Sequence, residues 1–363
     1  MADHRRKGTG CLGCIGWSVL GGLLLVVFLW VAFVTRDLWV PAVAAVEGIT
    51  VSAGNLTNPQ STLPPATQTE LNSLPNTGNT SDQVLPPPAQ ATLQALPAYP
   101  TPDVGLERLR EYMLSLINKD RIDHGLQPVK FDQLATVVGQ AHAVNMLENG
   151  YFSHWNPAGF GPDLRYAFAG GVAAVQENIA QVQLATIAGE PIPITDWSQQ
   201  LKALEKGFMS SPGHRANILY PAHNAVGIGI AYDPQVGQLY VAQEFINRYV
   251  QMEAPQELPQ SGQSTVHGQL LEGASEPLVN LDFEPFPQAM TVAELNQTEV
   301  YQPGGDLVAI RVPDVQDGTF TIQVPVNQGS KPGLYHVRVW VMVNGERVQG
   351  ADLLLVVGNL PGS

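Results

Sequence analysis

Ser211-Pro212-Gly213-His214-Arg215-Ala216-Asn217-Ile218-Leu219 is the stretch of this sequence that decides the fold. Two shorter stretches lie upstream of it: Tyr151-Phe152-Ser153-His154 and Gln176-Glu177-Asn178-Ile179-Ala180. Together they carry two histidines and a carboxylate, His154, Glu177 and His214, in three separate turn-rich segments. Clefts are commonly assembled from loops on a rigid scaffold, so we expect these three side chains to converge.

The composition sets broad limits on the protein. A chain of 363 residues is long enough for two domains and their connections. The formal net charge of -14 argues against a nucleic-acid partner, because phosphate binding needs a basic surface. The two cysteines, Cys11 and Cys14, leave no disulfide for the remaining chain. Such a pair can bind a metal or act in redox chemistry, but without a second pair a reduced pair beside the membrane is favoured.

Residues 15–34 form an uncharged apolar run of about twenty residues, the length that spans a bilayer. Arg5, Arg6 and Lys7 precede it, which predicts that residues 1–14 are cytoplasmic and that the bulk of the chain lies outside the cell membrane. A cleaved signal peptide is the alternative, since Ala42-Val43-Ala44 offers small residues, and the protein would then be secreted. The length of the run favours an uncleaved transmembrane helix that serves as a signal-anchor.

Two stretches rich in proline and polar residues divide the rest of the chain. Residues 51–102 hold few large apolar side chains and are expected to be a disordered tether. Residues 254–264 are expected to be a second linker. Two domain-sized regions remain, 104–250 and 265–360.

The first region combines helical and strand patterns. Apolar spacing predicts helices at residues 106–124, 132–150 and 198–209, and strands at 225–232 and 239–245. Asp132 is a good N-cap, and Gly125 ends the first helix. We therefore expect a domain of helices and an antiparallel sheet.

The second region consists of short alternating runs that are typical of strands. They occupy residues 307–312, 319–324, 335–341 and 352–357. Asn344-Gly345 between two apolar runs is a strong hairpin signal. Strands at this spacing predict a β-sandwich, in which we expect His336 and Asp352 to be surface or strand-pairing residues.

Several motifs of the first region occur in the order in which they occur in one known family. They are Ala141-His142-Ala143, Phe152-Ser153-His154, Glu177-Asn178-Ile179, Ser211 to Leu219 and Val226-Gly227-Ile228-Gly229. On these residues the region 104–250 resembles the CAP superfamily of SCP-like, antigen 5 and pathogenesis-related proteins, in its short bacterial form. The resemblance implies an α-β-α sandwich with a shallow cleft. The fold class expected for the chain is α+β: a transmembrane helix, a CAP-type sandwich and an all-β Ig-like sandwich.

In the CAP superfamily two histidines and two glutamates line the cleft, and the histidines can hold a divalent metal. His154, Glu177 and His214 match three of these four positions. The resemblance thus implies His154 and His214 as metal ligands, for Zn²⁺ or another divalent cation. Asn178 and Arg215 are expected beside them in the ligand-binding cleft.

The fourth family position, a second glutamate, falls at or near Ser211 in this sequence. Glu205 and Glu244 are candidates to replace it. The unusually long stretch 181–195 is expected to lie near the rim of the cleft.

Other polar residues near the motifs have structural interpretations. His142, in the middle of its helix beside alanines, is expected to be a packed or helix-facing histidine. Glu177 can also serve as a buried hydrogen-bonding residue that holds loops together. We expect Arg215 and Asn217 to hold their loop through backbone hydrogen bonds, and His124 and His223 to lie at the surface.

Three functions fit the sequence. The first is a surface-displayed binding module for a lipid, glycan, peptide or cell-wall component. The second is an envelope hydrolase, with His154 or His214 as base, Glu177 as its orienting group and Ser153 or Ser211 as nucleophile. Neither a Gly-x-Ser-x-Gly elbow nor a His-Glu-x-x-His helix occurs in the sequence. The third is a purely structural surface protein.

Overall fold

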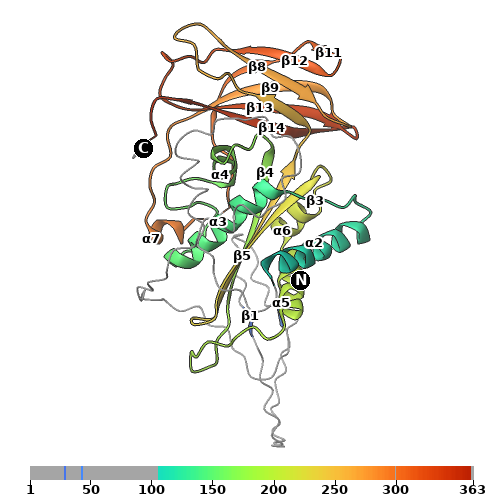
Figure 1. The fold of residues 1–363 in the computed structure, drawn as a ribbon, viewed down its shortest axis with the longest axis vertical. Coiled ribbons are helices and arrows are strands. Elements are labelled where there is room, and N and C mark those ends of the chain that lie inside the picture. The colour runs from blue at the N-terminus through green and yellow to red at the C-terminus, as the bar shows by residue number, and fades with distance from the viewer. Residues whose placement is uncertain (1–27, 30–41, 44–104, 299, 361–363) are drawn as a thin grey trace, which may run out of the picture.

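A computed structural model describes residues 28–29, 42–43, 105–298 and 300–360 of the chain (Figure 1). The expected cytoplasmic segment 1–14, the tether 51–102 and most of the expected membrane helix 15–34 lie outside these residues. Two residues of that segment are described: Phe28–Leu29 form strand β1, which pairs antiparallel with β2, Ala42–Val43. None of the helices within the described ranges has the length and apolar character needed to cross a membrane.

The first domain is built on a four-stranded sheet in the order β3-β5-β6-β4. Its strands are β3 (Lys130–Phe131), β4 (Ala174–Gln183), β5 (Ala225–Asp233) and β6 (Gln238–Asn247). β5, β6 and β4 are antiparallel, and β3 runs parallel to β5. β4 is therefore an edge strand, and this position decides where the candidate site forms.

The helices predicted for this domain are confirmed to within two residues at each end. They are α2 (Leu106–Asp123), α3 (Gln133–Asn149) and α5 (Trp197–Ser210). Asp132 caps α3 by accepting a hydrogen bond from the backbone N–H of Ala135, and Gly150 ends it in the left-handed region at φ 66°. Two short helices that begin with proline were not predicted: α4 (Pro162–Phe168) and α6 (Pro212–Ile218).

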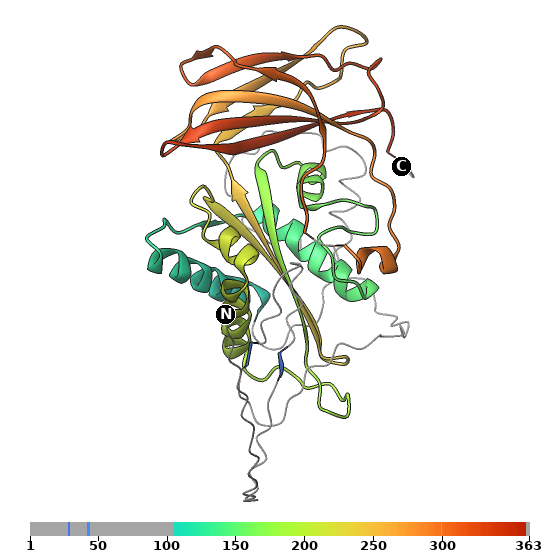
Figure 2. The same ribbon diagram turned by 180° about the vertical axis from the view of Figure 1, so that it is seen from behind.

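Side chains of β6 alternate between two helical layers. Leu239, Val241 and Phe245 pack with α2 and α5, whereas Tyr240 and Ala242 pack with α3. The domain is thus an α-β-α sandwich, as Figure 2 shows from behind Figure 1. The α3 layer approaches closely because β5 carries glycine there: a Cβ on Gly227 would lie 2.1 Å from the carbonyl carbon of Ala135.

The second domain is all-β, as predicted, and consists of two antiparallel four-stranded sheets. One has the order β10-β9-β13-β14, with bounds Asp306–Arg311, Ser275–Glu284, Gly333–Val343 and Glu346–Val357. The other has the order β11-β12-β8-β7, with bounds Val315–Gln316, Thr319–Val324, Ser264–Leu270 and Val250–Glu253. Apolar residues from both sheets share one core.

The structure corrects the expected boundary between the domains. β7 begins three residues after β6 ends and pairs with β8 in the second domain. The expected linker 254–264 therefore connects β7 to β8, whose first residue is Ser264, instead of separating two domains, because a proline-rich composition suits a long loop as well as a linker.

The connection between β9 and β10, residues 285–305, crosses to the first domain. Its short helix α7 (Val292–Leu295) lies beside α3 in both ribbon views (Figures 1 and 2). Leu295 is fully buried in the core cluster that includes Met146 and Leu147 of α3. The second domain thus covers part of the first one.

Candidate functional site

His154 lies in the loop after α3 and is oriented by Glu177 on the edge strand β4. Its Nδ1 is 2.8 Å from Oε1 of Glu177, whose side chain is fully buried. Burial, with the positive charge of Arg165, lowers the pKa of His154 to about 4. His154 is therefore a neutral imidazole at pH 7 that donates its Nδ1 proton to Glu177 and has Nε2 free of that bond.

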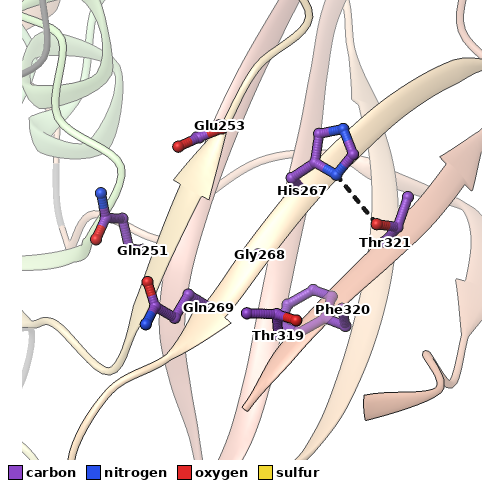
Figure 3. Close-up of a pocket in the computed structure, with 8 residues that line it drawn as sticks. All are labelled: Gln251, Glu253, His267, Gly268, Gln269, Thr319, Phe320 and Thr321. Carbon is purple, nitrogen blue, oxygen red and sulfur yellow. Dashed lines mark hydrogen bonds between the residues drawn. The ribbon is translucent and has the colours of Figure 1, made fainter. Parts of the chain in front are cut away.

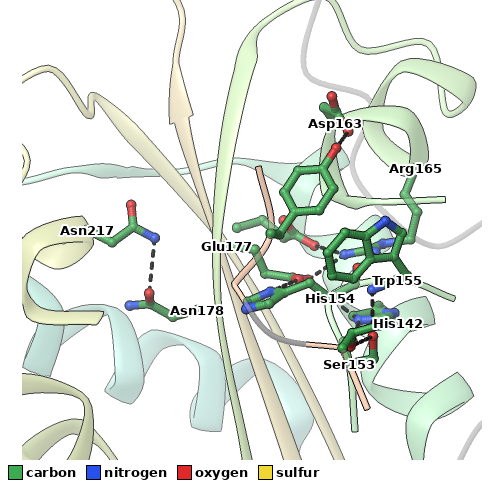
Figure 4. Close-up of polar contacts among 12 residues, drawn as sticks. His142, Ser153, His154, Trp155, Asp163, Arg165, Glu177, Asn178 and Asn217 are labelled. Atoms are coloured by element: carbon green, nitrogen blue, oxygen red, sulfur yellow. Dashed lines mark hydrogen bonds and ion pairs between the residues drawn. The ribbon is translucent and has the colours of Figure 1, made fainter. Parts of the chain in front are cut away.

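Arg165 on α4, labelled in Figure 4, and Glu244 on β6 complete the group around Glu177. Arg165 donates to Glu177, lies 3.3 Å from Glu244, and also donates to the carbonyl of His154. Glu177 and Glu244 are directly opposite in the β4–β6 register, so both face the α3 side of the sheet. Burial, together with the charge of Glu177, raises the pKa of Glu244 well above its ordinary value. One carboxylate, one neutral carboxyl and one guanidinium then balance each other.

Neighbouring residues hold this arrangement in place. His142, buried as predicted, donates from Nε2 to the carbonyl of Ser153 at 2.9 Å. The hydroxyl of Ser153 lies 2.7 Å from that of Thr298, a residue of the β9–β10 connection, and accepts from the backbone N–H of Trp155. Trp155 in turn packs edge-to-face against Tyr301 of the same connection, at a centroid distance of 4.9 Å. The second domain therefore forms part of the wall around His154.

His214 sits in the first turn of α6, on the other face of the sheet. Its Nδ1 is 2.9 Å from the hydroxyl of Ser211, the residue before the helix. Burial, assisted by His154, lowers the pKa of His214 to about 3. The amide of Asn178 donates to the carbonyl of His214 at 3.2 Å and so ties α6 to β4.

Edge strand β4 therefore explains how the three motifs converge. Glu177 and Asn178 are adjacent, so their side chains leave the strand on opposite faces. Glu177 holds His154 from one face, and Asn178 holds the loop of His214 from the other. β4 pairs with β6 alone among the described strands, so its other edge is open, and the charge of His154 acts on His214.

Three expectations from the sequence need correction. Arg215, expected in the cleft, instead lies 2.8 Å from His124, beyond the end of α2. His223, expected at the surface, is 3% exposed between the amides of Asn217 and Asn247 and stacks on Phe245. Both corrections arise because chain-distant elements pack against these residues.

The third correction concerns position. Gln183 ends β4 six residues beyond Glu177, about 20 Å along an extended strand, so stretch 181–195 leads away from the candidate site. His336 and Asp352, expected to be surface or strand-pairing residues, contact each other at 3.0 Å across the paired strands β13 and β14. They are 1% and 7% exposed because their strands face the first domain.

The carboxyl groups of both candidates for the missing glutamate contact other partners. The carboxyl of Glu244 is directed to Arg165 and Glu177. That of Glu205, on α5, accepts from Gln243 at 2.8 Å and is 2% exposed. Burial raises the pKa of Glu205 to about 8. Of the groups that match the family positions, the two imidazoles are the ones whose ring nitrogens suit a metal ion.

These residues fit a divalent cation through two neutral imidazoles, with Glu177 as an orienting group. A carboxylate that accepts from the far nitrogen of a ligating histidine is the usual support of such a site. The residues fit the proposed hydrolytic set less well. Glu177 orients His154, whereas the hydroxyl of Ser211 contacts His214, so the orienting carboxylate and the candidate nucleophile hold different histidines.

Arg165 is a site residue that the sequence analysis missed, and the contact of Glu244 with Arg165 beside Glu177 was not predicted either. Arg165 lies in a short helix that only Pro162 announces, and the strand that carries Glu177 was not predicted. With β4 recognised, counting along the β4–β6 pairing would have placed Glu244 opposite Glu177.

The described residues also include a shallow pocket on the outer face of the second domain (Figure 3). It is lined by Gln251, Glu253, His267, Gly268, Gln269, Thr319, Phe320 and Thr321. His267 is exposed and lies 3.0 Å from the hydroxyl of Thr321. The titratable side chains of this lining, Glu253 and His267, are both exposed, so the pocket does not resemble the buried His154 site.

Comparison with known proteins points to one family. The model of the cysteine-rich secretory protein family, CAP, matches residues 114–245. The uncharacterized protein YkwD of Bacillus subtilis (strain 168) is 28% identical over 137 residues, which are 38% of this chain and 46% of that protein. The uncharacterized membrane protein YlbC of the same strain is 31% identical over 137 residues, 38% of this chain and 34% of that protein. The chain thus spans less than half the length of these curated relatives.

Two solved structures are also similar. An extracellular protein containing a SCP domain from Bacillus anthracis str. Ames has a TM-score of 0.32 and 25% identity, over 42% of this chain and 45% of that one. An outer surface protein from Borrelia burgdorferi has a TM-score of 0.33 and 16% identity, over 40% of this chain and 96% of that one.

Proposed function

Since residues 114–245 of this chain form a domain of the CAP family, we propose that the protein is a binding module displayed outside the cytoplasm. Its ligand is a component of the cell envelope or its surroundings, of lipid, glycan or peptide class. The apolar run 15–34 anchors it in the membrane, and the tether 51–102 sets its reach. The relative YlbC, which is named a membrane protein, supports this location.

One observation carries the proposal: two neutral imidazoles are held by separate partners around one strand edge. Glu177 orients His154 and Ser211 orients His214. Orienting contacts of this kind reduce the entropy lost when a ligand binds. Two neutral imidazoles with fixed rings suit a divalent cation, which would supply a positive charge for an anionic ligand group.

Metal titration of the full chain by calorimetry tests the proposal. The variants are His154→Ala and His214→Ala, and His267→Ala, an exposed histidine of the other domain, is the matched control. We expect each of the first two variants to lose one equivalent of Zn²⁺ that the control retains. Unchanged Zn²⁺ binding in both variants would refute the cation site.

A hydrolase is the second candidate, and the Ser211–His214 contact of 2.9 Å is the observation that favours it. A histidine in contact with a hydroxyl can act as its general base. Turnover of ester or peptidoglycan substrates that is lost in Ser211→Ala would support this function. Turnover that survives in Ser211→Ala and in His214→Ala would exclude this pair as its source.

A further inference from the structure

A second cluster of potential ligands lies where α4 of the first domain meets β13 and β14 of the second. Asp163, His336 and Asp352 each offer one ligand atom there, and these atoms all lie within 4.8 Å of one another. The three residues are 8%, 1% and 7% exposed. None of them belongs to the His154–His214 site.

The charges around this cluster do not balance. Carboxyl groups come from Asp163, Asp352, Asp282 and Glu284, whose side chain is 24% exposed. Arg338, which pairs with Asp282 and Asp352, and His336 are the cations in contact with them. Even with His336 protonated, four carboxylates would face two positive charges, and such an excess is costly in a buried place.

Two polar atoms of the cluster are also unsatisfied. Oδ2 of Asp163 and Nε2 of His336 are buried and make no hydrogen bond within the described residues, although Nε2 lies 3.5 Å from the carboxylate of Glu284. The other oxygen of Asp163 accepts from the hydroxyl of Tyr301, so the orientation of this carboxyl is fixed while Oδ2 stays unpaired. Buried polar atoms without partners commonly mark an absent water or ion.

We propose that Asp163, His336 and Asp352 bind one divalent transition-metal cation, with Zn²⁺ as the best fit. One imidazole and two carboxylates are a donor set that Zn²⁺ accepts at about 2.0–2.2 Å. Its charge offsets the excess of carboxylates. Tyr301 and Arg338 then act as supports that orient Asp163 and Asp352.

This site would have a structural consequence for the cleft. It joins α4, which carries Arg165, to the domain whose β9–β10 connection contacts Ser153 and Trp155. A bound cation therefore stabilises the position of the second domain against the His154 side of the first. This inference stands without the proposed function.

The test is calorimetric titration of the full chain with Zn²⁺, in a His154→Ala, His214→Ala background that removes the first proposed site. We expect one equivalent to remain, and to be lost in Asp163→Asn and in His336→Gln but retained in His267→Gln. No equivalent in the background protein, or one that both variants retain, would overturn the proposal.

A measurement on the background protein alone covers the case in which these variants do not fold. X-ray absorption of its Zn²⁺-loaded form should show one imidazole nitrogen together with carboxylate oxygens. A shell without imidazole, or one with several imidazoles, would place the metal elsewhere and refute the assignment.

Discussion

Glu205→Gln should stabilise the protein at neutral and alkaline pH. Glu205 lies on α5 in the first core, 2% exposed, and burial raises its pKa to about 8 from an ordinary 4.5. Because the pKa of Glu205 is higher in the folded state than in the unfolded state, its protonated form contributes fully to stability below pH 4.5. That contribution is lost as pH rises towards 8.

The magnitude follows from the two pKa values. Between pH 4.5 and pH 8, the buried carboxyl of Glu205 lowers the free energy of unfolding by about 1.4 kcal/mol for each pH unit. The loss is about 3 kcal/mol at pH 7 and about 5 kcal/mol at pH 8 and above. A glutamine does not titrate, and its amide oxygen can accept the same hydrogen bond from Gln243. In the parent protein, Oε1 of Glu205 has no hydrogen-bond partner among the described residues. The glutamine amide nitrogen at the same position would also lack a partner, so this atom contributes about equally to both proteins.

The assay is urea unfolding followed by circular dichroism at pH 5 and pH 8. We expect the free energy of unfolding of Glu205→Gln to exceed that of the parent by several kcal/mol at pH 8, and by far less at pH 5. Glu111→Gln, at an exposed site on α2, is the control and should leave the pH dependence unchanged. Equal pH slopes for Glu205→Gln and the parent would refute the reasoning.

Two further predictions concern packing and acid stability. Gly227→Ala should destabilise the protein by about 3 kcal/mol, because the new Cβ would lie 2.1 Å from the carbonyl carbon of Ala135. In the control Gly105→Ala, the new Cβ meets nothing within 4 Å, so stability should change little. Thermal unfolding of both variants and the parent measures the difference. His214→Gln should reduce the loss of stability on acidification in metal-free buffer. Burial lowers the pKa of His214 to about 3, so its neutral form contributes fully to stability above pH 6.5. As the pH falls to 4, the free energy of unfolding decreases by about 3 kcal/mol through this residue. Urea unfolding at pH 7 and pH 4, with exposed His124→Gln as the control, should show the difference, and an unchanged acid limb would contradict the lowered pKa.

Local patterns in the sequence were enough for the long helices, for the strands of the hairpin and for the family of the first domain. Helix α3 illustrates why: its apolar spacing, its cap at Asp132 and its left-handed end at Gly150 are all properties of neighbouring residues. The Ser211–Leu219 stretch likewise identified the domain without knowledge of its partners. Short helices such as α4 were not predicted, because a helix of 7 residues has too few turns to show the helical periodicity of apolar residues.

The partners of each polar side chain were decided by the tertiary structure alone. Glu244 meets Glu177 through strand register, and His336 meets Asp163 because the second domain packs on α4. Burial then changes the chemistry: it holds His154 and His214 neutral and raises the pKa of Glu205. The sequence by itself determined which chemical groups are present and the elements that carry them. Their charge state and contacts depend on segments far apart in the chain, which only the packed structure brings together.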